Sequence, residues 1–398
     1  NTNAMSTNHL RLYFIDAIRA WAILMMLQGH FIDGLLDNAF RDNSNIIFSV
    51  WKYFRGITAP VFFTVSGFIF TYLLIKVPQV GWDNPRVKKG IKRGFQLLVI
   101  GYLLRVNLLG LFQGEIYSSF YLVDVLHCIG LSILGIIGVY VLTANSKKWV
   151  FPSILLTLTF VLFLFEPYYK AANFYLLPQW IANYFTKANG SVFTILPWFG
   201  YATFGSFMSI LFNKYKNKKQ LYSYAISIAL VTGALLIFCS SDFFLALSGL
   251  TGIQLFADIF FNNYLFIRLG DVLVVFTVFM LLRKFLTNKV GLRLGQSTLS
   301  IYIIHFIILY GSFTGLGLYG FFHHSLTPWV IIPGALVFII ICSYLALRYE
   351  DNKAFIKAAV NNLLGIVKLQ IERITLISFG ILRVLSIRIL RLFGLTKN

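Results

Sequence analysis

The stretch "IDAIRAWAILMMLQGHF" (residues 15–31) is long and apolar enough to begin a membrane-spanning helix, yet it carries three ionisable residues, Asp16, Arg19 and His30. The whole chain shares its apolar character, because 58% of its 398 residues are hydrophobic and only 12% are charged. A soluble domain carries about 25% charged residues. No small-residue cleavage site follows the first stretch, so we expect a retained span and not a signal peptide. The sequence therefore predicts an all-α integral membrane protein.

Apolar runs of the length that a bilayer requires, about 20 residues, recur ten times and predict about ten transmembrane helices. When the loops alternate between the two sides, starting inside, only Arg41, Lys52, Lys170 and Lys187 of the 34 Lys and Arg residues fall in outside loops. The positive-inside rule then places both termini in the cytoplasm of a multi-pass plasma (inner) membrane protein. The net charge of +20 follows this orientation, and no nucleic-acid partner is expected. The predicted spans are residues 13–36, 54–75, 94–112, 123–142, 149–166, 191–212, 221–239, 264–285, 296–313 and 328–347.

Two domains are predicted: a polytopic membrane domain at residues 1–348 and a basic C-terminal segment at 349–398. The second alternates apolar and basic positions, which suits an amphipathic helix on an anionic cytoplasmic leaflet; an eleventh span is the alternative. Outside loops are expected at 166–185 and 240–264. The basic residues of the C-terminal segment include Lys357, Lys368, Arg373, Arg383, Arg388 and Arg391.

Arg19 and His30 should project from one face of the first helix. They are eleven residues apart, which is three turns plus roughly 20°. Asp16 and Asp33 share that face, three residues before Arg19 and three after His30. Intramembrane ionisable residues are functional candidates by default. Arg19 alone could equally anchor the helix at the interface by snorkelling, but His30 lies too deep for that.

These residues carry a resemblance to a known group. Arg, ten residues and then His, introduced by Asp-x-x-Arg, resembles the signature of the membrane acyltransferase superfamily, which includes the acyltransferase-3 and heparan-alpha-glucosaminide N-acetyltransferase-like proteins. Similar motifs follow in order from residue 59 to 311. They are "APVFFTVSGFIFTYLL" (59–74), "RVKKGIKRGFQLLVIGYLLR" (86–105), "DVLHCIGLSIL" (124–134), "LPWFGYATFGSFMS" (196–209) and "LGQSTLSIYIIHFIILYG" (294–311).

The resemblance implies an enzyme that moves an acyl group, usually acetyl, from cytosolic acetyl-CoA to a sugar hydroxyl or amine on the other side of the membrane. The usual Arg-Gly of the family is Arg19-Ala20 here. Some heparan-type members place a catalytic His in the following outside loop, but residues 37–53 contain none, which favours His30. A transporter or flippase of a lipid-linked or anionic substrate is the alternative function.

The expected mechanism has His30 acting as general base on the acceptor, with its tautomer fixed by a carboxylate such as Asp33. An acyl-imidazole on His30 fits equally well. Arg19, paired with Asp16, would hold the CoA arm or its phosphates. The basic residues after the second span could bind the CoA phosphates, or serve only to orient the chain. They are Arg86, Lys88, Lys89, Lys92 and Arg93.

Several further residues are weaker candidates. Ser66 faces either a neighbouring helix or the pantetheine chain. Asp124 and His127, spaced i and i+3, form a structural pair or a second proton-transfer site. His305 ranks second to His30, with Tyr302 as a hydrogen-bond partner on the same face. Trp198 stacks on a sugar ring or belongs to the interfacial aromatic belt.

The cysteines predict neither a disulfide nor a metal site, because Cys128, Cys239 and Cys342 lie apart in apolar stretches. The expected partners are acyl-CoA, a glycan or glycolipid acceptor and membrane lipid. The acceptor, O- or N-transfer, the acyl chain length and the oligomeric state, a homodimer included, stay open at the sequence level.

Overall fold

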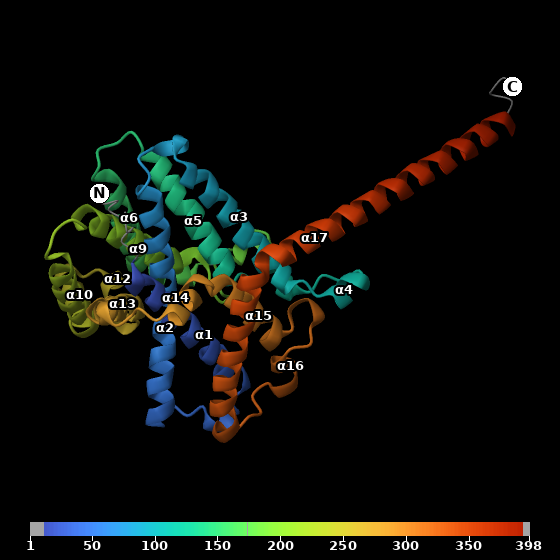
Figure 1. Ribbon diagram of the computed structural model, residues 1–398. Helices are drawn as coiled ribbons and strands as arrows, with labels where there is room; N and C mark the ends of the chain where they lie inside the picture. Colours follow the sequence, from blue (N-terminus) through green and yellow to red (C-terminus); the bar gives the residue numbers. More distant parts are fainter. Residues whose placement is uncertain (1–11, 173, 393–398) are drawn as a thin grey trace, which may run out of the picture. The chain divides into compact units, whose positions relative to one another are not determined.

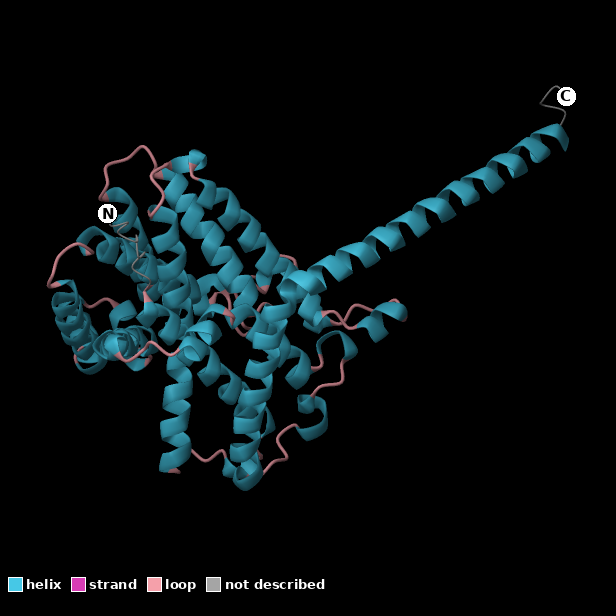
Figure 2. Ribbon diagram, in the orientation of Figure 1, coloured by secondary structure: helices cyan, strands magenta, loops and turns pink. Residues whose placement is uncertain are grey.

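The computed structural model describes residues 12–172 and 174–392 and consists of α-helices joined by loops (Figure 1, Figure 2). Within those residues the one strand-like pairing is an isolated bridge between Leu36 and Leu326. The predicted all-α class is therefore confirmed. The longer helices are α1 (Tyr13–Leu35), α2 (Ile46–Ile75), α3 (Pro85–Arg105), α5 (Val125–Leu142), α6 (Val150–Leu164), α9 (Ile195–Tyr215), α10 (Leu221–Phe238), α13 (Tyr264–Leu281), α15 (Thr298–Tyr310) and α17 (Pro328–Leu392).

By length and apolarity, seven helices of the described part of the chain can cross a membrane, or up to eight if one bent helix pair counts as one span. That pair is α14 (Lys289–Gln296) with α15, bent by 73°. A count of ten would also require α3, whose first half is strongly basic, and α6, which has only 15 residues. The membrane protein class is thus established, whereas the number of spans stays a prediction.

The boundaries of three predicted spans differ clearly from those of the helices: 328–347 lies in α17, which continues to Leu392, and the other two are 54–75 and 94–112. α2 begins at Ile46, well before residue 54, because the Asn45 side chain accepts hydrogen bonds from the first free backbone N–H groups. The predicted span at 94–112 is divided. α3 starts at Pro85 behind the Asn84 cap and ends at Arg105, and the short helix α4 (Leu108–Phe112) follows.

The connections expected to be outside loops are largely helical. Residues 166–185 contain α7 (Glu166–Ala171) and α8 (Gln179–Ala182). Residues 240–264 contain α11 (Ser240–Thr251) and α12 (Gln254–Phe261). The remaining short helix is α16 (Leu318–Phe322).

α2 and α9 cross closely enough for their backbones to touch. A Cβ atom at Gly67 would lie 2.0 Å from the carbonyl oxygen of Ala202, and one at Gly205 would lie 1.8 Å from that of Thr64. The hydroxyl of Ser206 donates to the carbonyl of Gly67 at 3.2 Å. Small residues at a membrane helix crossing permit this approach, so α2 and α9 form a fixed unit at the centre of the bundle.

The chain separates into two compact units, residues 1–345 and 346–398, and the division falls within α17. The described part of the second unit is a single helix. Large apolar side chains such as Phe355, Leu369 and Phe379 are each more than 60% exposed in it. Basic residues occur between them, among them Lys353, Lys357, Lys368 and Arg373.

Candidate active site

The charged start of α1 packs against the junction of α14 and α15. The guanidinium of Arg19 donates to the hydroxyl of Thr298 at 3.1 Å and lies 3.7 Å from the carboxylate of Asp16. The amide of Gln296 donates to that carboxylate at 3.1 Å. These polar groups therefore face protein, where an intramembrane Arg can be satisfied.

A glycine makes this contact between α1 and α14 possible. A Cβ atom at Gly295 would lie 1.9 Å from the carbonyl oxygen of Asp16, so a larger residue there would push the helices apart. Directly after Gly295 the chain bends between α14 and α15, and Thr298 is the first residue of α15. The bend places the Thr298 hydroxyl at the Arg19 guanidinium.

The deeper polar residue of α1, His30, meets a second histidine. Its Nδ1 lies 3.1 Å from Nε2 of His305, and the ring centroids are 5.3 Å apart. His305 is fully buried, whereas His30 is half-buried. The rings of Tyr302 and Tyr310 lie 4.9 Å from His305 and 6.2 Å from His30, respectively. The two imidazoles thus share a hydrogen bond among aromatic rings, and the less buried of them is His30.

Both polar contacts of α1 are made with the same neighbouring helix. Arg19 meets Thr298, and His30, eleven residues further on, meets His305. Because the order is the same on both helices, α1 and α15 run in the same direction. The two polar contacts, eleven residues apart on α1, therefore join the same pair of helices, and the α1 side chains of Ile23 and Leu27 between them are apolar and buried.

Asp33 does not contact His30. Its carboxylate Oδ1 accepts from the guanidinium groups of Arg41 and Arg55. The partner of His30 Nδ1 is His305, so an imidazole stands where a carboxylate was expected. Asp33 lies about one helical turn beyond His30 and binds two arginines instead.

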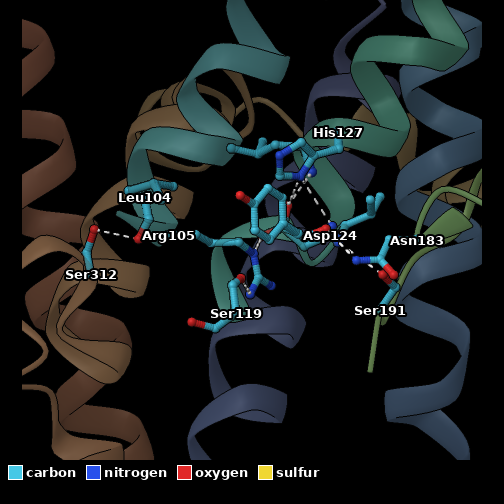
Figure 3. A network of polar contacts seen from close by, with 11 residues as sticks. Leu104, Arg105, Ser119, Asp124, His127, Asn183, Ser191 and Ser312 are labelled. Atoms are coloured by element: carbon cyan, nitrogen blue, oxygen red, sulfur yellow. Dashed lines mark hydrogen bonds and ion pairs between the residues drawn. The ribbon is translucent and has the colours of Figure 1, made fainter. Parts of the chain in front are cut away.

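A second buried network surrounds Asp124, the N-cap of α5 (Figure 3). Its carboxylate lies 3.1 Å from Nδ1 of His127 and accepts from Nε of Arg105 at 3.2 Å. Arg105 also donates to the carbonyl of Ser119 and lies over the ring of Phe306 on α15. Asp124 and His127 thus form a pair, and Arg105 links that pair to the helix of His305.

Arg105 also lines a cavity of about 120 Å³ at the end of α3. The other lining residues come from α4 and the connection to α5 and include Asn107, Glu115, Tyr117 and Phe120.

The basic residues after α2 lie on the first turns of α3. Lys88, Lys89, Lys92 and Arg93 are exposed and Arg86 is half-buried. In the part of the chain that the structure describes, no acidic side chain pairs with Lys88, Lys89 or Lys92. Arg93 lies near enough to Arg19 for its positive charge to oppose the charge of that guanidinium.

Two other candidates have structural partners. The hydroxyl of Ser66 donates to the carbonyl of Phe62 at 2.7 Å, and Ser66 borders a small space between α2, α5 and α9. Trp198 packs against Phe63 at 5.3 Å between ring centroids and against Phe193 at 4.9 Å. Neither residue takes part in the polar contacts between α1 and α15.

Sequence reasoning assigned no site role to Arg55 or Arg105, although each is an arginine within a predicted span. An arginine inside a membrane span is a functional candidate by default, so their positions alone could have identified both residues. Their partners, Asp33 and Asp124, lie 22 and 19 residues away on other segments, so periodicity within one helix cannot find them. Across residues 12–172 and 174–392, no group of three His, Cys, Asp or Glu side chains could hold a metal ion.

The fold and site define a class: a polytopic helical membrane protein with a hydrogen-bonded pair of imidazoles and with arginines that have polar partners inside its bundle. Residues 11–243, more than half of the chain, match the family described as heparan-alpha-glucosaminide N-acetyltransferase, catalytic. The chain therefore belongs to this family of membrane acetyltransferases. A comparison with curated protein sequences finds no match.

Proposed function

We propose that the protein transfers an acetyl group from cytosolic acetyl-CoA to a sugar hydroxyl or amine at the extracytoplasmic face, with His30 as the reacting group. The observation that carries this proposal is the hydrogen bond between Nδ1 of His30 and Nε2 of His305. It joins two imidazoles from α1 and α15 into one oriented unit in a chain of the membrane acetyltransferase family. Acyl transfer needs such a unit, because a proton must leave the acceptor as it attacks.

In this proposal His305 fixes the tautomer of His30. When Nδ1 of His30 donates to His305, Nε2 of His30 carries a lone pair and can accept the acceptor's proton. The acceptor oxygen or nitrogen then bonds to the thioester carbonyl carbon, the carbon–sulfur bond breaks, and the imidazolium returns its proton to the thiolate. The same lone pair can instead take the acetyl group first, as an acyl-imidazole.

Acetyl-CoA supplies the activated acetyl group, and the basic residues at the start of α3 suit its polyanionic nucleotide. Exposed ammonium groups without acidic partners favour phosphate as charge-assisted donors. Lys88, Lys89 and Lys92 form that group, and the guanidinium groups of Arg86 and Arg93 lie on the same first turns of α3. Arg93 acts on the charge of Arg19, and Arg19 is held by Asp16 and Thr298. The pantetheine arm would follow α1 and α15 toward His30, with Ser66 on a neighbouring helix.

The proposed topology has ten spans, with both termini in the cytoplasm of the plasma (inner) membrane. This topology counts α3 and α6 as spans in addition to the eight that length and apolarity allow. The parallel course of α1 and α15 supports it, because the first and ninth spans cross the membrane in the same direction. The second unit would lie on the anionic cytoplasmic leaflet through its interleaved basic and apolar residues.

The test uses purified protein, radiolabelled acetyl-CoA and a panel of amino sugars and neutral sugars. His30→Ala should lower acetyl transfer and acetyl-CoA hydrolysis by about 10²- to 10⁴-fold, the usual share of general base catalysis. His323→Ala, which changes an exposed imidazole, is the matched control. If His30→Ala turns over at the wild-type rate, His30 is not the reacting group.

A further inference from the structure

Two arginines converge on a single carboxylate just beyond His30. Arg41 and Arg55 both donate to Oδ1 of Asp33. One carboxylate neutralises one guanidinium, so this cluster of Asp33, Arg41 and Arg55 keeps one surplus positive charge. The side chains of Arg55 and Asp33 are 38% and 39% exposed, so a ligand can reach them.

Among the described residues, Asp33 is the one acidic side chain that forms an ion pair with Arg41 or Arg55. The loop between α1 and α2 holds Asp37 and Asp42, and each caps its own turn. The carboxylate of Asp37 accepts from the backbone of Ala39 at 2.9 Å. Hydrogen bonds from the side chain and backbone of Ser44 hold the pKa of Asp42 below its ordinary value.

The arginines are fixed beside the imidazole pair. The Arg55 side chain crosses α1 at Gly29, where an added Cβ would lie 3.2 Å from its Cγ, and its charge acts on His30. Arg41 is held by His324, because its guanidinium lies 3.0 Å from Nδ1 and 3.2 Å from Nε2 of that imidazole, and Nδ1 also lies 3.1 Å from the carbonyl oxygen of Leu36. Preorganised donors lose little entropy on binding an anion.

Basic residues are scarce in the loops that are predicted to lie outside the membrane, so two arginines at one carboxylate there are unexpected. Arg41 is one of only four Lys and Arg residues in the predicted outside loops. The nearby Lys52 donates to Asn43 at 2.9 Å and takes no part in the cluster. Orientation in the membrane disfavours Arg41 and Arg55 here, so a binding role explains their position better.

We propose that the Asp33, Arg41 and Arg55 cluster binds an anionic group of the acceptor, a carboxylate, phosphate or sulfate close to the accepting hydroxyl or amine. This inference rests on the proposed function and narrows its substrate class. Arg55 and Arg41 donate to the anion, with bidentate geometry available to each guanidinium. Asp33 holds the arginines in place when no acceptor is bound and competes with the anion for them.

The experiment measures binding to the purified full chain without acetyl-CoA. The probes are N-acetylglucosamine and three charged counterparts: its 6-phosphate, its 6-sulfate and N-acetylmuramic acid. Dissociation constants come from thermal-shift titrations at fixed low ionic strength. Wild-type protein should bind at least one charged sugar about ten- to a hundred-fold more tightly than the neutral parent, as charge-assisted hydrogen bonds imply. Comparing the three charged sugars shows whether the cluster prefers a phosphate, a sulfate or a carboxylate.

Variants decide which residues produce the preference. Arg41→Gln with Arg55→Gln should bring the affinity ratio of charged to neutral sugar close to one, and Lys52→Gln should leave it at the wild-type value. Asp33→Asn should raise the ratio, because it removes the competing carboxylate. If the double Gln variant does not fold, Asp33→Asn and the charge-keeping Arg41→Lys with Arg55→Lys still give a result.

Equal affinities for charged and neutral sugars in the wild type would overturn the proposal, and so would a ratio that the arginine substitutions do not change. Because the assay needs no turnover, it is independent of His30. An anion preference without acetyl transfer would contradict the proposed function alone, and transfer without anion preference would contradict this inference alone.

Discussion

At the residue scale, the chemistry depends on which atom of His30 is left for the substrate. His305 lies 3.1 Å from Nδ1 of His30, so in the proposed mechanism Nε2 is the ring nitrogen that meets the substrate. In many acyl transferases and hydrolases a carboxylate orients the catalytic imidazole. In the proposed mechanism a second, fully buried imidazole takes that role, and it adds no negative charge to a membrane interior where charge is costly.

His305→Ala should therefore lower kcat for acetyl transfer by roughly 10²-fold, within the range of acid–base effects. The imidazole of His30 would remain but lose its orienting partner. His305→Asn should retain more activity than His305→Ala, because the amide oxygen can accept from Nδ1 of His30. Measured kcat values for the two variants check this, and equal values would contradict an orienting role.

The sequence predicted part of this site. The helical period of 3.6 places Arg19 and His30 on one face, and their observed contacts with Thr298 and His305 lie on one neighbouring helix. The pairing of His30 with His305 spans 275 residues and depends on tertiary packing. Local spacing favoured Asp33 as the partner, whereas Arg41 and Arg55 engage that carboxylate.

At the scale of elements, the close crossing of α2 and α9 supports the bundle. Gly67→Ala should lower the free energy of unfolding by about 1–3 kcal/mol, since its Cβ would meet the Ala202 carbonyl at 2.0 Å. Gly249→Ala on α11 is the matched control, because nothing lies within 4 Å of its Cβ. Melting temperatures in detergent check this, and equal values for both variants would show that the crossing is not tight.

We expect the lysines at the start of α3 to bind the phosphates of acetyl-CoA. Replacing Lys88, Lys89 and Lys92 together by Gln should raise KM for acetyl-CoA on the order of tenfold at low salt and change kcat little. The reason is that these lysines would bind the substrate and the transition state equally well, so their loss weakens binding without slowing the chemical step. The effect should shrink at high salt, where surface charges are screened. Lys147→Gln with Lys148→Gln, an exposed basic pair elsewhere, should behave like the wild type. Equal KM values for both variants would remove the segment from CoA binding.

Element boundaries were harder to predict than element types. Every predicted span contains a helix, because apolar runs near 20 residues have few other structures in lipid. The caps at Asn45 and Asn84 moved the starts of α2 and α3 earlier, into polar sequence that an apolar window ignores. The helices α7, α8, α11 and α12 lie in segments that hydropathy treats as connections.

At the scale of the whole molecule, the proposed mechanism requires two groups of residues that lie at different depths along α1. Cationic groups at the start of α3 and Arg19 form one group, and the imidazole pair with the Asp33 cluster forms the other. On α1 the separation of Arg19 and His30 is eleven residues, about 16 Å at 1.5 Å per residue. That suits a thin acyl carrier with a phosphate-bearing head. Composition and loop charge predicted the membrane class, but they cannot reveal that Arg19 and His30 both contact α15.

The most direct measurement is an experimental structure of the protein with CoA bound. The account predicts density for the nucleotide near Lys88, Lys89 and Arg93, an arm that passes Arg19 along α1 and α15, and a thiol within hydrogen-bond reach of His30. Density at another face of the bundle, or CoA at the basic end with its thiol remote from His30 and packed aliphatic side chains between, would contradict it.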